Sequence, residues 1–160
     1  MTKRTGYSTT QIVLHWLTAA AVVIAFFTHE AMEQIADTAW KNGAEPFPTP
    51  HTIAGFATLL LVVIRLVIRH RHGAPEPAAH GLMLTGAIWG HRLLYGLLVA
   101  VPVLGFATWI IGIRGLSDVH GNLGKAIMVV ALGHAAMAIW HQFAKKDGTL
   151  MRMLRPQPKD

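Results

Sequence analysis

The chain has 160 residues, of which 52% are hydrophobic and only 14% charged, and it contains ten histidines and no cysteine. A soluble domain is typically about 25% charged, so this composition, with a mean hydropathy of +0.41, favours a membrane protein over a soluble one. The lack of cysteine excludes disulfides, thiolate-held iron–sulfur clusters and covalently attached c-type haem. Any bound metal must therefore be held by histidine, carboxylate or methionine.

Four stretches of the chain contain no Asp, Glu, Lys or Arg: residues 6–29, 46–64, 93–113 and 126–144. Each approaches or exceeds the roughly 20 residues that cross a bilayer core as a helix. Their residues are apolar on all sides, whereas a soluble four-helix bundle would show polar stripes at the helical period. We therefore expect an all-α integral membrane four-helix bundle. It forms a single domain, residues 1–160, with helices at about 9–30, 51–70, 90–112 and 120–144.

The first stretch can also be read as a cleaved signal peptide, because Lys3 and Arg4 precede its apolar run. That run is long, however, and no cleavage site of the A-x-A type follows it. We expect a retained transmembrane helix.

Prolines mark several boundaries of the later helices. Pro46, Pro48 and Pro50 lead directly into the second helix, which we expect to end among Arg65, Arg69 and Arg71. Residues 73–90 are expected to form a loop that can include a short surface helix. The third helix contains Pro102, which we expect to kink it. A short turn over residues 112–121 leads into the fourth helix.

The positions of the basic residues predict the orientation in the membrane. Eleven lysines and arginines lie on one side of the four spans and three on the other, namely Lys41, Arg114 and Lys125. Cytoplasmic loops carry the excess of such residues, so we expect both termini in the cytoplasm. The basic charge of +6 thus reflects topology, and no nucleic-acid partner is expected.

Two histidines lie at the same depth near the cytoplasmic side. His15 follows Arg4 by 11 residues, and His134 precedes Lys145 by 11 residues. Both therefore lie about 16 Å along a helix from cytoplasmic charges. An ionisable residue inside a span is a functional hypothesis by default, although a single histidine can equally be a hydrogen-bonding residue between helices.

A second pair of histidines lies near the opposite surface, because His51 opens the second helix and His120 opens the fourth. His120 and His134 are 14 residues apart, which returns them to within about 40° of one helix face, roughly 21 Å apart. Two imidazoles that clamp a planar macrocycle give the bis-histidine ligation of a b-type haem. Two haems are therefore expected, an inner one on His15 and His134 and an outer one on His51 and His120. A structural zinc would need four ligands, and each level offers two.

The remaining histidines are weaker candidates. His91 and His141 share a shallow level, where interfacial hydrogen bonding or contact with haem propionates is expected. Arg65, His91 and Arg92 are candidates for the propionates of the inner haem, and Lys125 for those of the outer one. For Arg65 and Arg92, ordinary anchoring of a cytoplasmic helix end is an equal alternative. His29, His70, His72 and His80 have no assigned role.

These residues resemble a known family. Tyr7-Ser8, Gln11-Ile12 and His15-Trp16-Leu17, then His51-Thr52-Ile53-Ala54-Gly55 and Arg65-Leu66, are similar to the opening of the prokaryotic cytochrome b561 family. So are His91, Leu94-Tyr95 and Pro102-Val103-Leu104-Gly105. The similarity continues through His120, Leu123-Gly124, residues 133–138 and His141 to residues 146–153. It covers nearly the whole chain.

The resemblance implies a four-helix cytochrome of the bacterial inner membrane with two b haems, whose ligands correspond to His15, His51, His120 and His134. It also implies electron exchange with ubiquinone or another membrane quinone. Some members resemble superoxide oxidases, which pass an electron from periplasmic superoxide to ubiquinone. The segment at residues 112–119 is shorter here than in those members, which leaves the external donor open.

Three functional hypotheses follow. The first is a superoxide:ubiquinone oxidoreductase or a similar quinone-linked enzyme with a small donor. The second is a membrane anchor that transfers electrons for a separate periplasmic dehydrogenase or hydrogenase. The outer acidic residues Glu30, Glu33, Asp37 and Glu45 favour this one, because they repel an anion and can dock a basic redox protein. The third is a non-redox protein such as a histidine-lined metal transporter.

Overall fold

The structure is a computed structural model of the chain, and it describes residues 6–44, 48–75 and 79–156. Four residues named above lie outside the described residues: Lys3, Arg4, Glu45 and Pro46.

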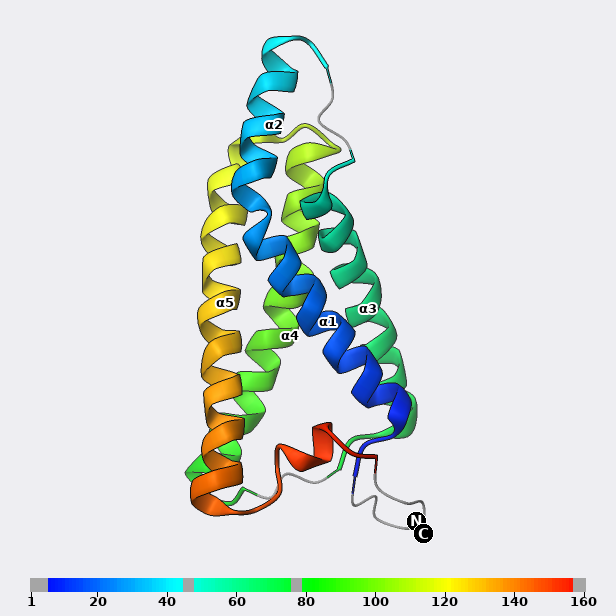
Figure 1. The fold of residues 1–160 in the computed structure, drawn as a ribbon, viewed down its shortest axis with the longest axis vertical. Coiled ribbons are helices and arrows are strands. Elements are labelled where there is room, and N and C mark those ends of the chain that lie inside the picture. Colours follow the sequence, from blue (N-terminus) through cyan, green and yellow to red (C-terminus); the bar gives the residue numbers. More distant parts are fainter. Residues whose placement is uncertain (1–5, 45–47, 76–78, 157–160) are drawn as a thin grey trace.

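Four long helices form the body of the molecule (Figure 1): α1 (Thr9–Phe27), α3 (Pro50–His72), α4 (Leu82–Trp109) and α5 (Ser117–Trp140). A one-turn π-helical segment, η2 (His141–Lys145), extends α5. All four are long and apolar enough to cross a membrane, which confirms the expected all-α membrane bundle. Helix α1 packs mainly on α3, α3 on α4 and α4 on α5, while α1 and α5 have far fewer contacts with each other.

The side chains that cover the bundle are those expected to face lipid. Leu60, Val129 and Leu132 are 63%, 70% and 63% exposed, an exposure of large apolar groups that water would penalise at about 25 cal/mol per Å². The central cluster of buried apolar side chains is small and consists of Val62, Leu97, Leu98 and Ile127. Hydrocarbon offers no hydrogen-bond partners, so the helices satisfy their buried hydroxyls internally. Thr18, Thr58 and Thr108 each donate to the carbonyl oxygen four residues earlier.

The segment after the first span differs from the expectation. We expected a helix to residue 30 and then a loop, but α1 ends at Phe27 and a separate helix, α2 (His29–Lys41), follows. Helix α2 projects beyond the other helices at one end of the bundle (Figure 1). Its Met32 and Ala36 are buried, whereas Glu30, Glu33 and Asp37 are exposed. This amphipathic pattern is enough to form a helix despite the charges.

The third span is also longer than expected at its start. Helix α4 begins at Leu82 instead of near residue 90, and it ends at Trp109 instead of 112. The second half of the segment at residues 73–90, for which we expected a loop with at most a short surface helix, is thus part of the third span. We expected the helix to begin near the charged Arg92, but this residue lies inside α4. Its guanidinium lies over the Trp89 ring at 4.9 Å. Long basic side chains can reach the membrane surface from within a helix.

The C-terminal segment closes the end of the bundle at which α1 begins (Figure 1). After η2 the chain turns back through a short helix, η3 (Met151–Met153). The indole Nε1 of Trp16 donates to the carbonyl oxygen of Met153 at 2.8 Å. At the opposite end a short helix, η1 (Arg114–Leu116), leads into α5, which begins three residues earlier than expected. The hydrogen bond from Trp16 to Met153 thus places the C-terminal segment beside the first half of α1, at the end of the bundle away from η1.

Candidate functional site

Helix α5 presents two histidines, and each one faces a histidine from another helix. The ring of His120 lies opposite that of His51 on α3, with 5.9 Å between ring centroids. The ring of His134 lies opposite that of His15 on α1, at 6.3 Å. The structure thus brings together the two pairs that equal depth in the sequence suggested, at two levels of one helix.

Both separations fit two imidazoles on opposite sides of one metal ion. With metal–nitrogen bonds of about 2.0 Å, the ring centroids of two such imidazoles are roughly 6 Å apart. Among the described residues, no group of three or more His, Cys, Asp or Glu could hold a metal ion. The donor sets are therefore suited to a metal that brings its own equatorial ligands, as the iron of a haem does.

The start of α3 fixes the position of His51. Thr49 is the N-cap residue, and its hydroxyl accepts from the Thr52 amide while the Thr52 hydroxyl accepts from the Thr49 amide. Pro50 occupies the first turn, where its missing N–H costs nothing. His51 follows at once, so a capped helix start holds the imidazole at the end of the span.

The two outer histidines are oriented by backbone carbonyl oxygens. His51 Nδ1 donates to Ala25 O of α1 at 2.8 Å, and His120 Nδ1 donates to Val101 O of α4 at 2.9 Å. A neutral imidazole with its proton on Nδ1 has a free lone pair on Nε2. Such hydrogen bonds are the usual support of metal-binding histidines.

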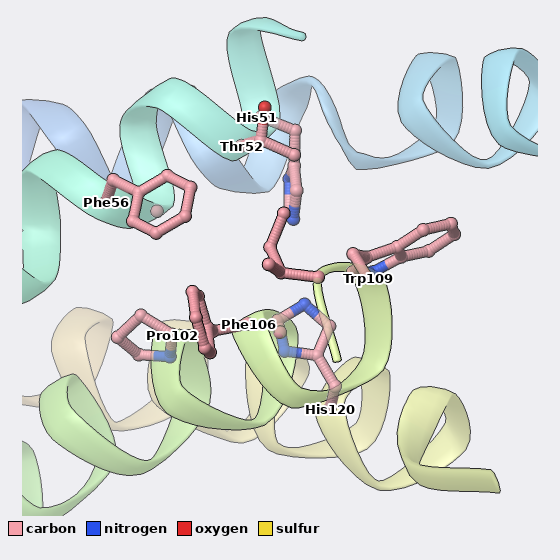
Figure 2. A pocket seen from close by; sticks show the side chains of 10 residues that line it. His51, Thr52, Phe56, Pro102, Phe106, Trp109 and His120 are labelled. Carbon is pink, nitrogen blue, oxygen red and sulfur yellow. The ribbon is translucent and has the colours of Figure 1, made fainter. Parts of the chain in front are cut away.

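Between the outer histidines lies a pocket with apolar and aromatic walls. Figure 2 shows His51 and His120 projecting into it from opposite sides, with Phe56, Phe106 and Trp109 around them. Gly105 leaves the room that the His120 ring occupies, because a Cβ there would stand 2.9 Å from His120 Cε1. The lining residues are His51, Thr52, Gly55, Phe56, Pro102, Gly105, Phe106, Trp109, Ile110 and His120.

An arginine and a third imidazole lie against the inner pair. Arg65 Nη2 lies 3.2 Å from His15 Nδ1, and the same guanidinium lies over the Tyr95 ring at 5.7 Å. His91 has its ring centroid 5.1 Å from that of His134, and its Nδ1 donates to Ala87 O at 2.7 Å. The structure therefore brings Arg65 and His91 to the inner pair.

The other two sequence candidates lie differently. Arg92 is exposed and packs against Trp89. Lys125 is exposed on α5, just over one turn after His120. Neither has a contact with a candidate histidine among the described interactions.

His141 is held by a network that the sequence analysis did not identify. Its Nδ1 donates to Asp147 Oδ2, and the backbone N–H and hydroxyl of Thr149 both donate to Asp147 Oδ1. Burial raises the pKa of Asp147, but the hydrogen bonds from Thr149 and His141 lower it by more, so that the resulting pKa is about 2. Asp147 is thus a carboxylate at neutral pH. The only sequence signal was the Asp-Gly-Thr turn after α5.

Comparisons with known proteins agree with this architecture. The family model described as prokaryotic cytochrome b561 matches residues 6–156. A cytochrome b562 from Cereibacter sphaeroides is 36% identical over 98% of this chain and 100% of its own length. Cytochrome b561 homolog 1 of Escherichia coli is 29% identical over 92% of this chain and 96% of its own. A probable superoxide oxidase CybB of Yersinia pestis is 28% identical over 92% of this chain and 95% of its own. This chain therefore belongs to the prokaryotic cytochrome b561 family, as a multi-pass cytochrome of the bacterial inner membrane that binds b-type haem.

Proposed function

We propose that the protein binds two b haems, an inner one between His15 and His134 and an outer one between His51 and His120. It transfers electrons between a donor on the periplasmic side and the membrane quinone pool, with both chain termini in the cytoplasm. The observation that carries this proposal is the presence of two facing imidazole pairs with ring centroids 5.9 and 6.3 Å apart.

When bound, haem iron supplies one-electron oxidation and reduction. The paired imidazoles would hold each haem from two sides, and a haem held in this way would serve electron transfer in preference to O₂ binding. Helix α5 carries one ligand of each pair and so fixes the spacing of the two sites along the membrane normal. The mostly apolar lining of the pocket around His51 and His120 suits the apolar face of a haem macrocycle.

The propionates of each haem need cations or hydrogen-bond donors. Arg65 and His91 are the partners we propose at the inner site, because both lie against its histidines. Lys125 is the candidate at the outer site. Arg92 packs on Trp89, which favours anchoring at the membrane surface over a propionate contact.

Superoxide is one candidate donor, and the similarity to a probable superoxide oxidase supports it. The exposed carboxylates of α2 support a second candidate, a basic redox protein such as a periplasmic dehydrogenase or hydrogenase. Glu30, Glu33 and Asp37 project at the end of the bundle where His51 and His120 lie. Negative charge repels the superoxide anion and attracts a basic partner.

Proteoliposomes that contain ubiquinone separate these donors. With superoxide generated enzymatically outside the vesicles, the first candidate predicts ubiquinone reduction that His51→Ala abolishes and His70→Ala, a change of an exposed histidine, leaves intact. The second predicts haem reduction only when a periplasmic redox protein is added. Failure of ubiquinol to reduce the haems and of reduced haems to reduce ubiquinone would contradict a quinone-linked function.

A further inference from the structure

Two arginines of α3 share one aromatic ring of α4. The guanidinium carbons of Arg65 and Arg69 lie 5.7 and 5.9 Å from the centroid of the Tyr95 ring. Arg65 also lies against His15 at the proposed inner site. Arg69 lies one turn further along α3 and is exposed, so its guanidinium can meet a group outside the bundle.

A tyrosine and a third arginine come to the same place from the two ends of the chain. Tyr7 precedes the cap of α1, and Arg152 lies in η3. Burial raises the pKa of the Tyr7 hydroxyl, and the positive charges of Arg69 and Arg152 act against this rise. Both guanidinium groups are therefore near Tyr7, whose hydroxyl keeps its proton at neutral pH. We call Tyr7, Arg69, Tyr95 and Arg152 the basic cluster.

Hydrogen bonds hold the segments that carry the basic cluster together. Gln11 Nε2 donates to Gly73 O at 3.0 Å and joins the start of α1 to the end of α3. Trp16 Nε1 donates to Met153 O at 2.8 Å, which fixes η3 beside α1. The basic cluster thus has a fixed frame, although its members are far apart in the sequence.

Positive charge at this end of the bundle is poorly balanced. Within the described ranges, Asp147 is the one acidic side chain here, because the other four carboxylates lie on α2 and at the start of α5, at the opposite end. Asp147 itself bonds to His141 and Thr149. Like charges that lie close together repel each other, most strongly away from water. The arginines of the basic cluster therefore favour an anion from outside the protein.

The position of the basic cluster favours a phospholipid as the source of that anion. Trp16 is 45% exposed, and a hydrogen-bonding indole beside an apolar span is typical of the membrane surface. Exposed apolar side chains line the same two helices, namely Val13 and Leu17 of α1 and Leu66 and Val67 of α3. They offer the acyl chains of a lipid a surface that free phosphate does not use. Basic pockets between transmembrane helices bind anionic headgroups in this way.

We propose that the basic cluster binds the phosphate of an anionic phospholipid in the adjacent leaflet, which is the cytoplasmic one in the proposed orientation. The guanidinium groups of Arg69 and Arg152 bind the phosphate oxygens. The Tyr7 hydroxyl donates a further hydrogen bond, and the Tyr95 ring holds Arg69 in place. The bound lipid links α3 to the C-terminal segment. This site needs no haem, so it is independent of the proposed function.

The test counts lipids bound to the full-length protein, purified in detergent and delipidated. Dioleoyl phosphatidylglycerol is titrated in, and bound molecules are counted by native mass spectrometry. We expect one molecule to bind more tightly than any others. Dioleoyl phosphatidylcholine should bind at least tenfold more weakly, because the arginines repel its choline cation. Inorganic phosphate at the same concentration should not displace the phosphatidylglycerol, because it lacks acyl chains.

Arg71 provides a matched control for Arg69. It is an exposed arginine two residues further along α3, and its charge does not act on Tyr7. Arg69→Met and Arg152→Met should each weaken the tight binding of phosphatidylglycerol roughly tenfold, the loss expected for a hydrogen bond to a charged group. Arg71→Met removes the same charge and should leave the tight binding unchanged. Tyr7→Phe keeps every charge and should weaken it roughly threefold.

Equal losses in Arg69→Met and Arg71→Met would show a response to net charge alone and would overturn the proposal. Displacement of the lipid by inorganic phosphate, or full affinity in both Arg69→Met and Arg152→Met, would overturn it as well. Where an arginine variant does not fold, Tyr7→Phe keeps the test, because unchanged affinity in that variant contradicts the site. Failure of the proposed function has a different signature, namely a missing Soret band, which does not enter the lipid count.

Discussion

A methyl group on Gly105 would stand 2.9 Å from Cε1 of His120, closer than unbonded carbon atoms approach in folded proteins. Helix α4 thus carries a glycine where α5 needs space for an imidazole. The same stretch of α4 supplies the Val101 carbonyl oxygen that accepts from His120 Nδ1. Space and orientation for one proposed haem ligand therefore come from two residues about one turn apart, on a helix that contributes no proposed ligand itself.

Replacement of Gly105 by alanine should impair the outer haem selectively. The methyl group would displace the His120 ring and weaken its hydrogen bond to Val101, at a cost of about 1–3 kcal/mol for overpacking. We expect haem content to fall toward one per chain, measured by pyridine haemochrome assay. Gly86→Ala on the same helix is the control, because a Cβ at Gly86 meets nothing within 4 Å. Equal haem content in both variants would argue against the role of Gly105.

Loss of the helix cap before His51 should also loosen the outer site. Thr49→Ala removes the hydroxyl that accepts from the Thr52 amide, and such a change costs about 1 kcal/mol. We expect a lower thermal midpoint in detergent and faster release of the outer haem, followed by Soret absorbance. Thr49→Ser keeps the cap and should behave as the wild type. Equal release rates in the alanine and serine variants would show that the cap does not position His51.

The C-terminal segment should open when its link to α1 is removed. Trp16→Phe keeps an aromatic ring but removes the donor to Met153 O, a hydrogen bond worth about 1 kcal/mol. The amides of residues 152–155, which bond within this segment, should exchange with deuterium roughly fivefold faster. Trp89→Phe, on another helix, should leave them unchanged. Unaltered exchange in Trp16→Phe would mean that the segment is held by other contacts.

The Asp147 network should stabilise the protein except in strong acid. The pKa of Asp147 is lowered from 3.8 to about 2, so its contribution is fully present above pH 3.8 and is lost as the pH falls through about 2. Asp147→Asn should therefore lower the thermal midpoint at pH 7, and the gap to wild type should narrow between pH 4 and pH 2. Thr149→Val removes one hydrogen bond to the carboxylate and should move this window upward. A gap that is the same at every pH would contradict the assigned pKa.

The sequence predicted the parts of the architecture that depend on length and spacing. Four uncharged stretches identified the four spans, and equal distances from terminal charges paired His15 with His134. Helix α2 was missed because its carboxylates suggested a loop, although Met32 and Ala36 have the spacing of a buried helix face. The start of α4 at Leu82 was missed because the charged Arg92 was taken to mark the beginning of the helix.

The orientation of the histidines could not be predicted in the same way. The carbonyl oxygens of Ala25 and Val101 have no side-chain signal, and their positions depend on how α1 and α4 pack. The contact of Arg65 with His15 joins residues on different helices, and the sequence placed both only by depth. The sequence shows Gly105 as a glycine within a span, but its role of leaving space for the His120 ring depends on how α5 packs against α4.

Haem content per chain in matched histidine variants tests the central claim most directly. Reduced-minus-oxidised spectra and pyridine haemochrome assays on purified protein should give two b haems in the wild type and in His70→Ala. His134→Ala should lose one haem and His120→Ala the other, with different residual α-bands. A wild-type protein without a Soret band, or a variant pair that keeps both haems, would contradict the assignment of two bis-histidine sites on α5.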